Sequence, residues 1–579
     1  MQLRFRGAQV FVALFAGACA AAHPSDSRAP PADAGARPQP ELQASRSPGS
    51  RTLPGPDAKP GTHADLVALF AQWREFQKPK LVDGVPDYTA AAMAAQQREL
   101  PAWQRRLQAL DPRAWPIPQQ VDFHIVRAEM NGLEFDHRVL QPWARNPAFY
   151  VTVFDEESDQ PAREGPFALG ALELWSYRTP LDAAAAEEIR ARLEPVPALL
   201  LQARGNLTGN ARDLWLFGIK AVKQERELLA QLGSKFPEKT PPGLAVQRAL
   251  DAVDRYLDWL EQLAPSKTGP SGVGIANYDW YLANVQLLPY TWADEVLLVQ
   301  RELARAKSAL LLEENRNRAL PEQQPVGSAE EFHRRFNAGI SEYMAFLKAR
   351  DVLTIRPDME PALHAHIGTY SDKRPLEFFS ESDYRDPEIL RTHGYHWFDL
   401  ARMRDDPNPD PIRRGALLYN IFDTRTEGFA TAMEELMMND GMCDARPRSR
   451  ELIYVLLAQR AARALGDLHM HANQRSLEEA ARDASAWTPR GWLRISGSTL
   501  WFEQHLYLQQ PGYGTSYVLG KLEIDKLIAA RADQLGKEFT LRRFMDEKDA
   551  AGLIPVSLLR WELTGKSDDV PGVGWPRPQ

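Results

Sequence analysis

The chain has 579 residues, of which 44% are hydrophobic and 25% charged, a composition typical of globular proteins rather than of disordered or fibrous ones. A chain of this length buries a large core and usually divides into two or more units. The formal net charge of -8 argues against general nucleic-acid binding, because such binding needs a basic surface. The two cysteines, Cys19 and Cys443, are too few for a disulfide framework.

The first nineteen residues are similar to a bacterial lipoprotein signal. Arg4 and Arg6 form a basic region, and an apolar run over residues 10–18 ends in small residues before Cys19. We therefore expect residues 1–19 to be a signal peptide with a lipobox and Cys19 to be lipidated. An ordinary secretory signal is the alternative. Either predicts an exported protein, facing the periplasm or anchored at the outer membrane, and touching the membrane only through its N-terminal lipid.

Residues 20–62 have the composition of a flexible linker. Nine of the chain's 44 prolines lie there, mixed with Ala, Ser, Gly and Arg. Such a stretch cannot bury enough apolar surface to offset the entropy lost on ordering. We expect a disordered tether between the signal and a globular body.

From residue 63 onward the apolar residues recur every three or four positions, as they do along 246–263, which predicts amphipathic helices. Thr291 followed by Asp294 is typical of a helix start. Further helices are expected over 65–76, 94–110, 183–204, 208–233, 328–350, 421–438, 449–483 and 517–536. Short strands are candidates only at 150–154 and 492–495. The sequence thus predicts a mainly α, two-lobed helical body with a central cleft and minor β segments.

A Pro/Ser/Gly-rich break begins at Pro265 and runs to Gly274, and predicts the boundary between the lobes. The N-terminal helical lobe would span 63–269 and the C-terminal lobe 270–579, the latter containing the site. Gly272 and Gly274 do not predict a nucleotide loop, because they follow a helix and lack a Gly-Lys-Ser/Thr ending.

Seven of the twelve histidines lie between residues 364 and 505, the clustering expected of a metal or acid/base site. His393 and His396 are three apart and share a helical face. Zinc needs three or four ligands, and Glu427, at the start of a predicted helix downstream, is a candidate third ligand. The alternative is that Glu427 complements the helix dipole and the histidines form ordinary hydrogen bonds.

Three motifs are similar to blocks of one bacterial family. Residues 511–521 resemble its Pro-Gly-x-x-x-Ser-Tyr-x-x-Gly block, and residues 427–430 resemble its Glu-Gly-Trp-Ala segment. Arg460, Arg463, Asp467 and His471 fit its Arg-x-x-Arg, Asp and His series. The chain from about residue 63 to 565 resembles the family filed as domain of unknown function 885. Many of its members are predicted lipoproteins, and it is grouped with helical zinc metallopeptidases.

The resemblance implies zinc, a peptide or peptide-like substrate, and a role for each matched residue. His393, His396 and Glu427 would bind the metal. Arg463, with Arg460 and His471, would hold a substrate carboxylate or a developing oxyanion, and Tyr517 would donate a hydrogen bond to it. A helix-to-helix ion-pair network is the other reading of the arginines and Asp467.

The family signature His-Glu-x-x-Pro-Gly-His is not intact in any alignment of this chain. Placing His393 first puts Gly394 at the base, and placing His396 last puts Leu390 and Arg391 at the His-Glu pair. Making His393 the last histidine keeps Glu388 but loses the first ligand. A hydrolase would then need a carboxylate from elsewhere, with Glu388, Asp399 and Glu434 as candidates.

Three hypotheses follow from the sequence. The first is a cell-envelope lipoprotein that is a divergent zinc-dependent peptide hydrolase. The second is a catalytically inactive relative that binds a peptide or an envelope partner without zinc. The third is a structural lipoprotein with no ligand. Metal content separates the first from the others.

Overall fold

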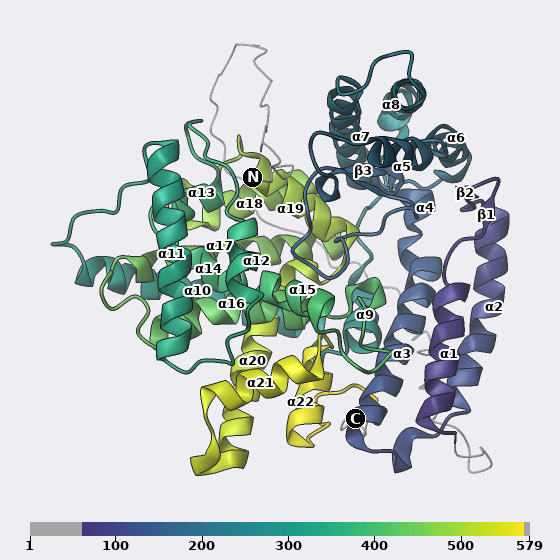
Figure 1. Ribbon diagram of the computed structural model, residues 1–579. Coiled ribbons are helices and arrows are strands. Elements are labelled where there is room, and N and C mark those ends of the chain that lie inside the picture. The colour runs from purple at the N-terminus through teal and green to yellow at the C-terminus, as the bar shows by residue number, and fades with distance from the viewer. Residues whose placement is uncertain (1–60, 573–579) are drawn as a thin grey trace, which may run out of the picture.

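The computed structural model describes residues 61–572 (Figure 1). The predicted signal peptide, Cys19 and all but the last two residues of the predicted tether lie outside this range. The prediction of a mainly α protein is confirmed: helices dominate the described residues, and strands occur in two short pairs. Within 61–572, no helix combines the length and the apolar character that crossing a membrane requires.

The first half of the described chain contains helices α1 to α10, four of them in a group that Figure 1 shows at the upper right, α5 to α8. Their bounds are α1 His63–Phe76, α2 Ala90–Gln108, α3 Ile117–Phe135, α4 Pro142–Arg145, α5 Ala183–Leu193, α6 Val196–Asn206, α7 Arg212–Gly233, α8 Pro241–Leu263, α9 Ile275–Tyr281 and α10 Trp292–Arg316. Two π-helical turns follow α3 and α9, at Asp136–Leu140 and Leu282–Gln286. Strands β1 (Leu81–Val82) and β2 (Val85–Pro86) pair antiparallel, and β3 (Val153–Phe154) and β4 (Leu172–Glu173) pair parallel.

The second half is helical throughout. Its helices are α11 Ala329–Ala349, α12 Met359–Ala365, α13 Phe378–Asp383, α14 Ile389–His393, α15 Tyr395–Asp405, α16 Asp423–Asn439, α17 Ser449–His471, α18 Leu477–Trp487, α19 Ser498–Gln509, α20 Tyr513–Leu535, α21 Leu541–Ala551 and α22 Val556–Thr564. Helix α17 is buried on nearly every face, as expected of a helix at the centre of a large core.

Local sequence explains several helix ends. Thr291 and Asp294 form the expected capping box of α10. The stretch predicted as one helix over 183–204 forms two helices, α5 and α6. Pro195 lacks a backbone N–H and cannot continue α5, and it occupies the N-cap position of α6. The predicted strand over 150–154 is reduced to β3, and residues 492–495 form no strand, since no partner strand lies beside them.

Two large hydrophobic clusters hold the fold together. One is built largely by α5 to α8, with Trp215 and Tyr256 fully buried in it. The other joins α1 to α3 with helices of the second half, from Trp73 to Phe429 and Leu559. The cores therefore link the N-terminal helices directly to the helices that follow residue 389. The predicted lobe boundary near residue 269 stays a prediction.

Helices α16 and α20 approach each other at two glycines. A Cβ atom built on Gly520 would lie 2.2 Å from the carbonyl oxygen of Thr424 and 2.7 Å from the Cα of Gly428. Because only hydrogen occupies these positions, the two backbones meet without a side chain between them. This contact sets the first turn of α16, with Glu427, beside the first turns of α20.

The connection between β3 and β4 is a long loop, residues 155–171, and is anchored by a buried carboxyl. Glu225 of α7 accepts hydrogen bonds from the backbone nitrogen of Thr152 at 2.7 Å and from its hydroxyl at 2.8 Å. Glu225 is 1% exposed, and burial raises the pKa of this carboxyl from 4.5 to about 7.

We expect Gly520→Ala to destabilise the protein by about 3 kcal/mol, because the new methyl group forces two backbones apart. Gly205→Ala is the matched control, since nothing lies within 4 Å of the Cβ position at Gly205 in α6. The control should be neutral or stabilise by about 0.5 kcal/mol. Chemical denaturation of both variants checks this, and equal stabilities would contradict the close contact.

We expect Glu225→Gln to reduce the loss of folding stability that the parent protein shows as pH rises from 4.5 to about 7. Between pH 4.5 and about 7 the unfolded chain ionises Glu225 while the folded chain keeps it neutral, so stability falls as pH rises. The loss is about 3 kcal/mol by pH 7, from about 1.4 kcal/mol per pKa unit. The free energy of unfolding, measured from pH 5 to 7.5, should decline less in the variant than in the parent. An identical decline would show that Glu225 is ionised in the fold.

Candidate metal centre

The two histidines of the site lie on either side of a helix break. His393 is the last residue of α14, and His396 lies in the first turn of α15. Gly394 makes the break, and a Cβ atom there would lie 3.0 Å from Leu363 and 3.1 Å from the carbonyl oxygen of Arg391. The break turns both imidazoles toward α16, where Glu427 lies in the first turns.

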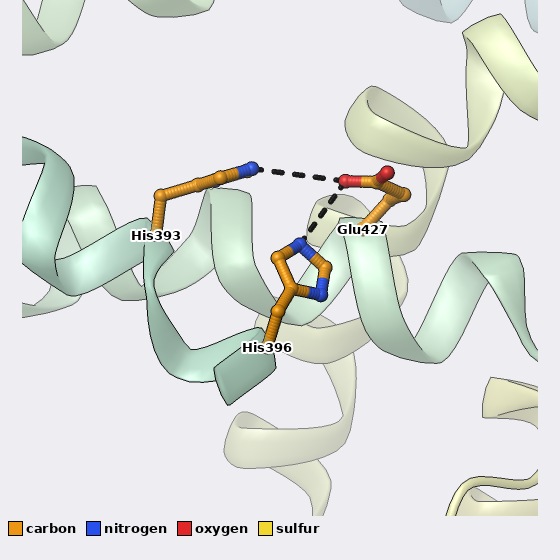
Figure 2. A group of neighbouring side chains, drawn as sticks. All are labelled: His393, His396 and Glu427. Carbon is orange, nitrogen blue, oxygen red and sulfur yellow. Dashed lines mark ion pairs between the residues drawn. The ribbon is translucent and has the colours of Figure 1, made fainter. Parts of the chain in front are cut away.

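The structure brings His393, His396 and Glu427 together (Figure 2). The Glu427 Oε2 atom lies 3.3 Å from His396 Nε2 and 3.7 Å from His393 Nε2. One ligand atom from each residue lies within 4.8 Å of the other two. Ligands bound to one zinc at about 2.1 Å in a tetrahedral arrangement are roughly 3.4 Å apart. The three side chains therefore converge nearly as closely as a shared metal requires.

Two of these atoms have no other use in the fold. His396 Nε2 and Glu427 Oε2 are both buried, and apart from the histidine–carboxylate contacts within the site neither has a polar partner in the described residues. A buried polar atom with so few partners costs free energy, and a bound cation would satisfy both atoms at once. The donor set of two imidazoles and one carboxylate is the set that helical zinc sites use. The residues present therefore fit a zinc ion.

The charges of the centre compensate one another. Burial would raise the pKa of Glu427, but His396, His393 and the Tyr513 hydroxyl lower it to about 2. Burial opposes the charged form of His396, yet Asp159 and Glu427 raise its pKa to about 9. Without a metal, His396 is thus a cation paired with the Glu427 carboxylate.

His393 has two polar neighbours at its Nδ1 atom, one a donor and one an acceptor. Its Nδ1 atom lies 3.2 Å from Glu434 Oε1 and 3.1 Å from an Arg460 nitrogen, and Arg460 also donates to both oxygens of Glu434. Because the guanidinium only donates, Nδ1 accepts from Arg460 when the imidazole carries its proton on Nε2. When the proton is on Nδ1, it points to Glu434 and leaves the Nε2 lone pair for a metal, and a carboxylate behind a ligating histidine orients it in this way.

Helix α20 lines the other side of the centre. Tyr513 donates a hydrogen bond from its hydroxyl to Glu427 Oε1. The Tyr517 ring lies parallel to His393, with centroids 6.4 Å apart, and 5.4 Å from the guanidinium carbon of Arg463. Arg463 is paired with Glu503 of α19. The Tyr517 hydroxyl makes no hydrogen bond within residues 61–572, and is thus free for a ligand.

The 155–171 loop covers the centre. Gln160 donates to Glu427 Oε1 at 3.0 Å, accepts from the Thr426 hydroxyl at 2.6 Å, and places its amide nitrogen 3.4 Å from His396 Nδ1. Glu164 lies 3.5 Å from the Tyr513 hydroxyl. Burial and then the Asp159 carboxylate raise the pKa of Glu164 to about 7. The loop thus brings a carboxylate with a near-neutral pKa to the centre.

Two residues of the predicted series support the site from behind. Asp467 accepts a hydrogen bond at 2.8 Å from the backbone nitrogen of Gly514, at the start of α20. A carboxylate there satisfies the exposed backbone groups of a helix N-terminus. His471 donates from Nε2 to the Tyr507 carbonyl at 2.9 Å, and burial lowers its pKa to about 4. These side chains hold α17, α19 and α20 together around the Pro511–Gly512 turn.

The carboxylates considered as replacement bases have other partners. Asp399 faces Arg425, at 3.2 Å, and Glu388 pairs with Arg446. Glu434 is engaged by Arg460 and His393. The structure therefore places Asp399, His471 and Glu388 in supporting contacts and keeps only Tyr517 and Arg463 of the predicted catalytic residues beside the centre.

Sequence reasoning missed the residues of the covering loop. Asp159, Gln160 and Glu164 lie more than 230 positions before His396, and no helical or strand periodicity marks them. The signal present in the sequence is the run of acidic residues, prolines and glycines that follows the short strand near Phe154. Tyr513 was within the matched 511–521 block but received no role.

A second group of ligand-type side chains, His63, Asp122 and Asp410, also converges. Its charge is already compensated, because Arg413 donates to Asp122 Oδ1 at 2.7 Å. His63 Nε2 lies 2.9 Å from the other oxygen of Asp122. These groups partner one another, so the arrangement does not fit a metal as the first one does.

The fold and the site thus define a mainly α protein with a three-residue candidate metal centre. The model of the family described as "Bacterial protein of unknown function (DUF885)" matches residues 396–563. The match confirms the resemblance expected from the motifs, and contains His396 and Glu427 but begins after His393. No curated protein matches the chain.

Two solved structures share the fold. A "putative lipoprotein of unknown function" from Shewanella oneidensis is 16% identical, with a TM-score of 0.61, over 86% of this chain and 99% of its own. A "putative lipoprotein" from Colwellia psychrerythraea is also 16% identical, with a TM-score of 0.57, over 87% of this chain and 98% of its own. At this identity the likeness shows a common architecture.

Proposed function

We propose that the protein is an exported lipoprotein that binds zinc at His393, His396 and Glu427 and hydrolyses amide bonds of peptides at the cell envelope. The observation that carries the proposal is the convergence of three ligand atoms, two of which are buried and have no hydrogen-bond partner outside the site. A zinc ion in such a site supplies Lewis acidity toward a carbonyl oxygen and lowers the pKa of water.

The chain's own groups supply the remaining requirements of amide hydrolysis. Glu164 is the proton acceptor, because its pKa of about 7 lets it take a proton from water and return it at neutral pH. The free Tyr517 hydroxyl donates a hydrogen bond to the carbonyl oxygen of the substrate. Arg463, paired with Glu503 and beside the Tyr517 ring, orients a substrate carboxylate.

The covering loop must move for a substrate to reach the centre. Gln160 is 3% exposed and its amide occupies the hydrogen-bonding positions next to Glu427 and His396. A peptide amide offers the same donor and acceptor as the Gln160 side chain. Substrate would therefore replace Gln160 at Thr426 and Glu427.

A second candidate function is peptide binding without zinc, and the same loop favours it. In the fold as described, Gln160 already satisfies Glu427 Oε1, and His396 and Glu427 neutralise each other. A relative that has exchanged its metal for this ion pair would keep the covered site for binding alone. Metal content separates the two candidates.

Export and lipidation rest on the N-terminal sequence. Arg4, Arg6, the apolar run and Cys19 have the order of a lipoprotein signal, and the two solved structures of like fold are described as lipoproteins. A Cys19→Ala variant that still incorporates radiolabelled palmitate in bacteria would contradict this assignment.

We expect the protein, purified without chelator, to contain about one zinc per chain, and His393→Ala and Glu427→Ala to contain less than a tenth of that. Each variant removes one ligand of three. His364→Ala is the matched control, because His364 is partly exposed and faces only Glu360. Metal analysis with a folding check by circular dichroism measures this. A parent protein without metal, or variants that keep it, would exclude the proposed centre.

We expect Glu164→Gln to lower the rate of peptide cleavage by about 100-fold or more while zinc content stays unchanged. In the parent, kcat/KM should rise with pH up to about 7 and then level, since the acceptor must be ionised. Glu156→Gln, on the same loop and exposed, is the control. Unchanged cleavage by Glu164→Gln would assign the base to another group.

A further inference from the structure

A cavity of about 300 Å³ lies between the covering loop and the helices near the start of the described chain. Its walls come from α2, α3 and the π-helical turn after it, from Ala162 and Gly165–Phe167 of the loop, and from residues 416–420 and 509–511. This volume is at the lower end of the range found for small-molecule sites. The cavity is connected to the metal centre through a shared wall residue. Gln510 lines the cavity and donates a hydrogen bond to Asp423, which lies one turn before Glu427 in α16.

The cavity is aromatic and carries a single charged residue. Six aromatic side chains line it: Tyr88, Trp143, Phe149, Phe167, Tyr281 and Tyr419. Its amide side chains are committed to the protein, since Gln96 bonds to His137 and to backbone carbonyls, and Gln509 accepts from Asn146. Gln510 accepts from both Asn420 and the backbone nitrogen of Gly165.

Asp136 is the charged residue, and its carboxyl has no partner in the described part of the chain. It makes no ion pair and no side-chain hydrogen bond there, although it begins the π-helical turn at the cavity wall. Burial alone raises the pKa of Asp136 to about 7, with no charged neighbour contributing. A carboxylate that is partly buried in a largely aromatic wall, with no charged neighbour, is disfavoured unless a cation reaches it.

The backbone at residues 419 and 420, which also line the cavity, is held in an unusual conformation. Tyr419 and Asn420 are consecutive non-glycine residues with positive φ, at 57° and 47°. A Cβ atom on Gly132 would lie 2.3 Å from the Tyr419 ring, so the glycine in α3 makes room for that ring. Left-handed residues and π-helical turns concentrate at ligand sites, where the surrounding structure enforces them.

We propose that this cavity binds a primary ammonium group carried on an apolar or aromatic body, with Asp136 as the counter-ion and the aromatic rings around the body. Aromatic faces attract cations, and a carboxylate gives a charge-assisted hydrogen bond to an ammonium. The volume suits a ligand of about the size of one amino acid. The site does not depend on the metal centre, because none of the three metal ligands lines it.

Isothermal titration calorimetry on the full mature chain tests the proposal with three molecules that share a phenylethyl body and differ in their polar group. The probes are 2-phenylethylammonium, 2-phenylethanol and 3-phenylpropionate. We expect the ammonium to bind at least tenfold more tightly than the alcohol, and the carboxylate not to bind. Equal affinity for the alcohol, or no binding of the ammonium, would overturn the proposal, and this comparison needs no variant.

Variants locate the binding. Asp136→Asn should weaken the ammonium at least tenfold while leaving 2-phenylethanol unaffected. Asp405→Asn, which changes an exposed carboxylate paired with Arg404, is the control and should change neither. Since an amine can also coordinate zinc, the ammonium is titrated into His393→Ala as well. Binding that survives in His393→Ala supports the cavity, and binding lost there but kept in Asp136→Asn would place the amine at the metal centre instead.

Discussion

The buried carboxylate of Glu427 is the group around which the centre is organised. Burying a carboxylate away from water costs several kcal/mol of desolvation free energy. Neighbouring charges and hydrogen bonds must offset this penalty. Those neighbours come from three separate parts of the chain: His393 and His396 flank a helix break, Tyr513 begins α20, and Gln160 lies in the loop after β3. Their contacts with one carboxylate therefore fix the relative positions of these parts.

Helix packing determines where that carboxylate lies. The glycine contact between Gly428 and Gly520 brings α16 and α20 to backbone distance, which leaves Glu427 facing the first turn of α20. Asp467 from α17 accepts from the backbone at that turn and holds it in place. Several residues matched to the family series thus act on the shape of the site without contacting its centre, because they are engaged in helix-to-helix contacts of the core.

Local sequence predicted the helices and the three residues that converge, but not the loop. Helices such as α8 and α10 follow from apolar spacing and from the Thr291 cap, which depend on neighbours a few residues apart. His393 and His396 are likewise local, and Glu427 was found as an acidic residue at the start of a predicted helix and again in a matched motif. Gln160 and Glu164 reach the centre through contacts across more than 230 residues, and Asp136 is notable only because its carboxyl makes no ion pair within residues 61–572. Such long-range pairings carry no periodic signal in the sequence.

The most direct test of the account is anomalous diffraction from crystals of the zinc-containing protein, with data on both sides of the zinc absorption edge. The account predicts one strong peak at about 2.0–2.2 Å from His393 Nε2, His396 Nε2 and Glu427 Oε2. A peak at His63, Asp122 and Asp410 instead, or no peak with the His396–Glu427 contact intact, would contradict it.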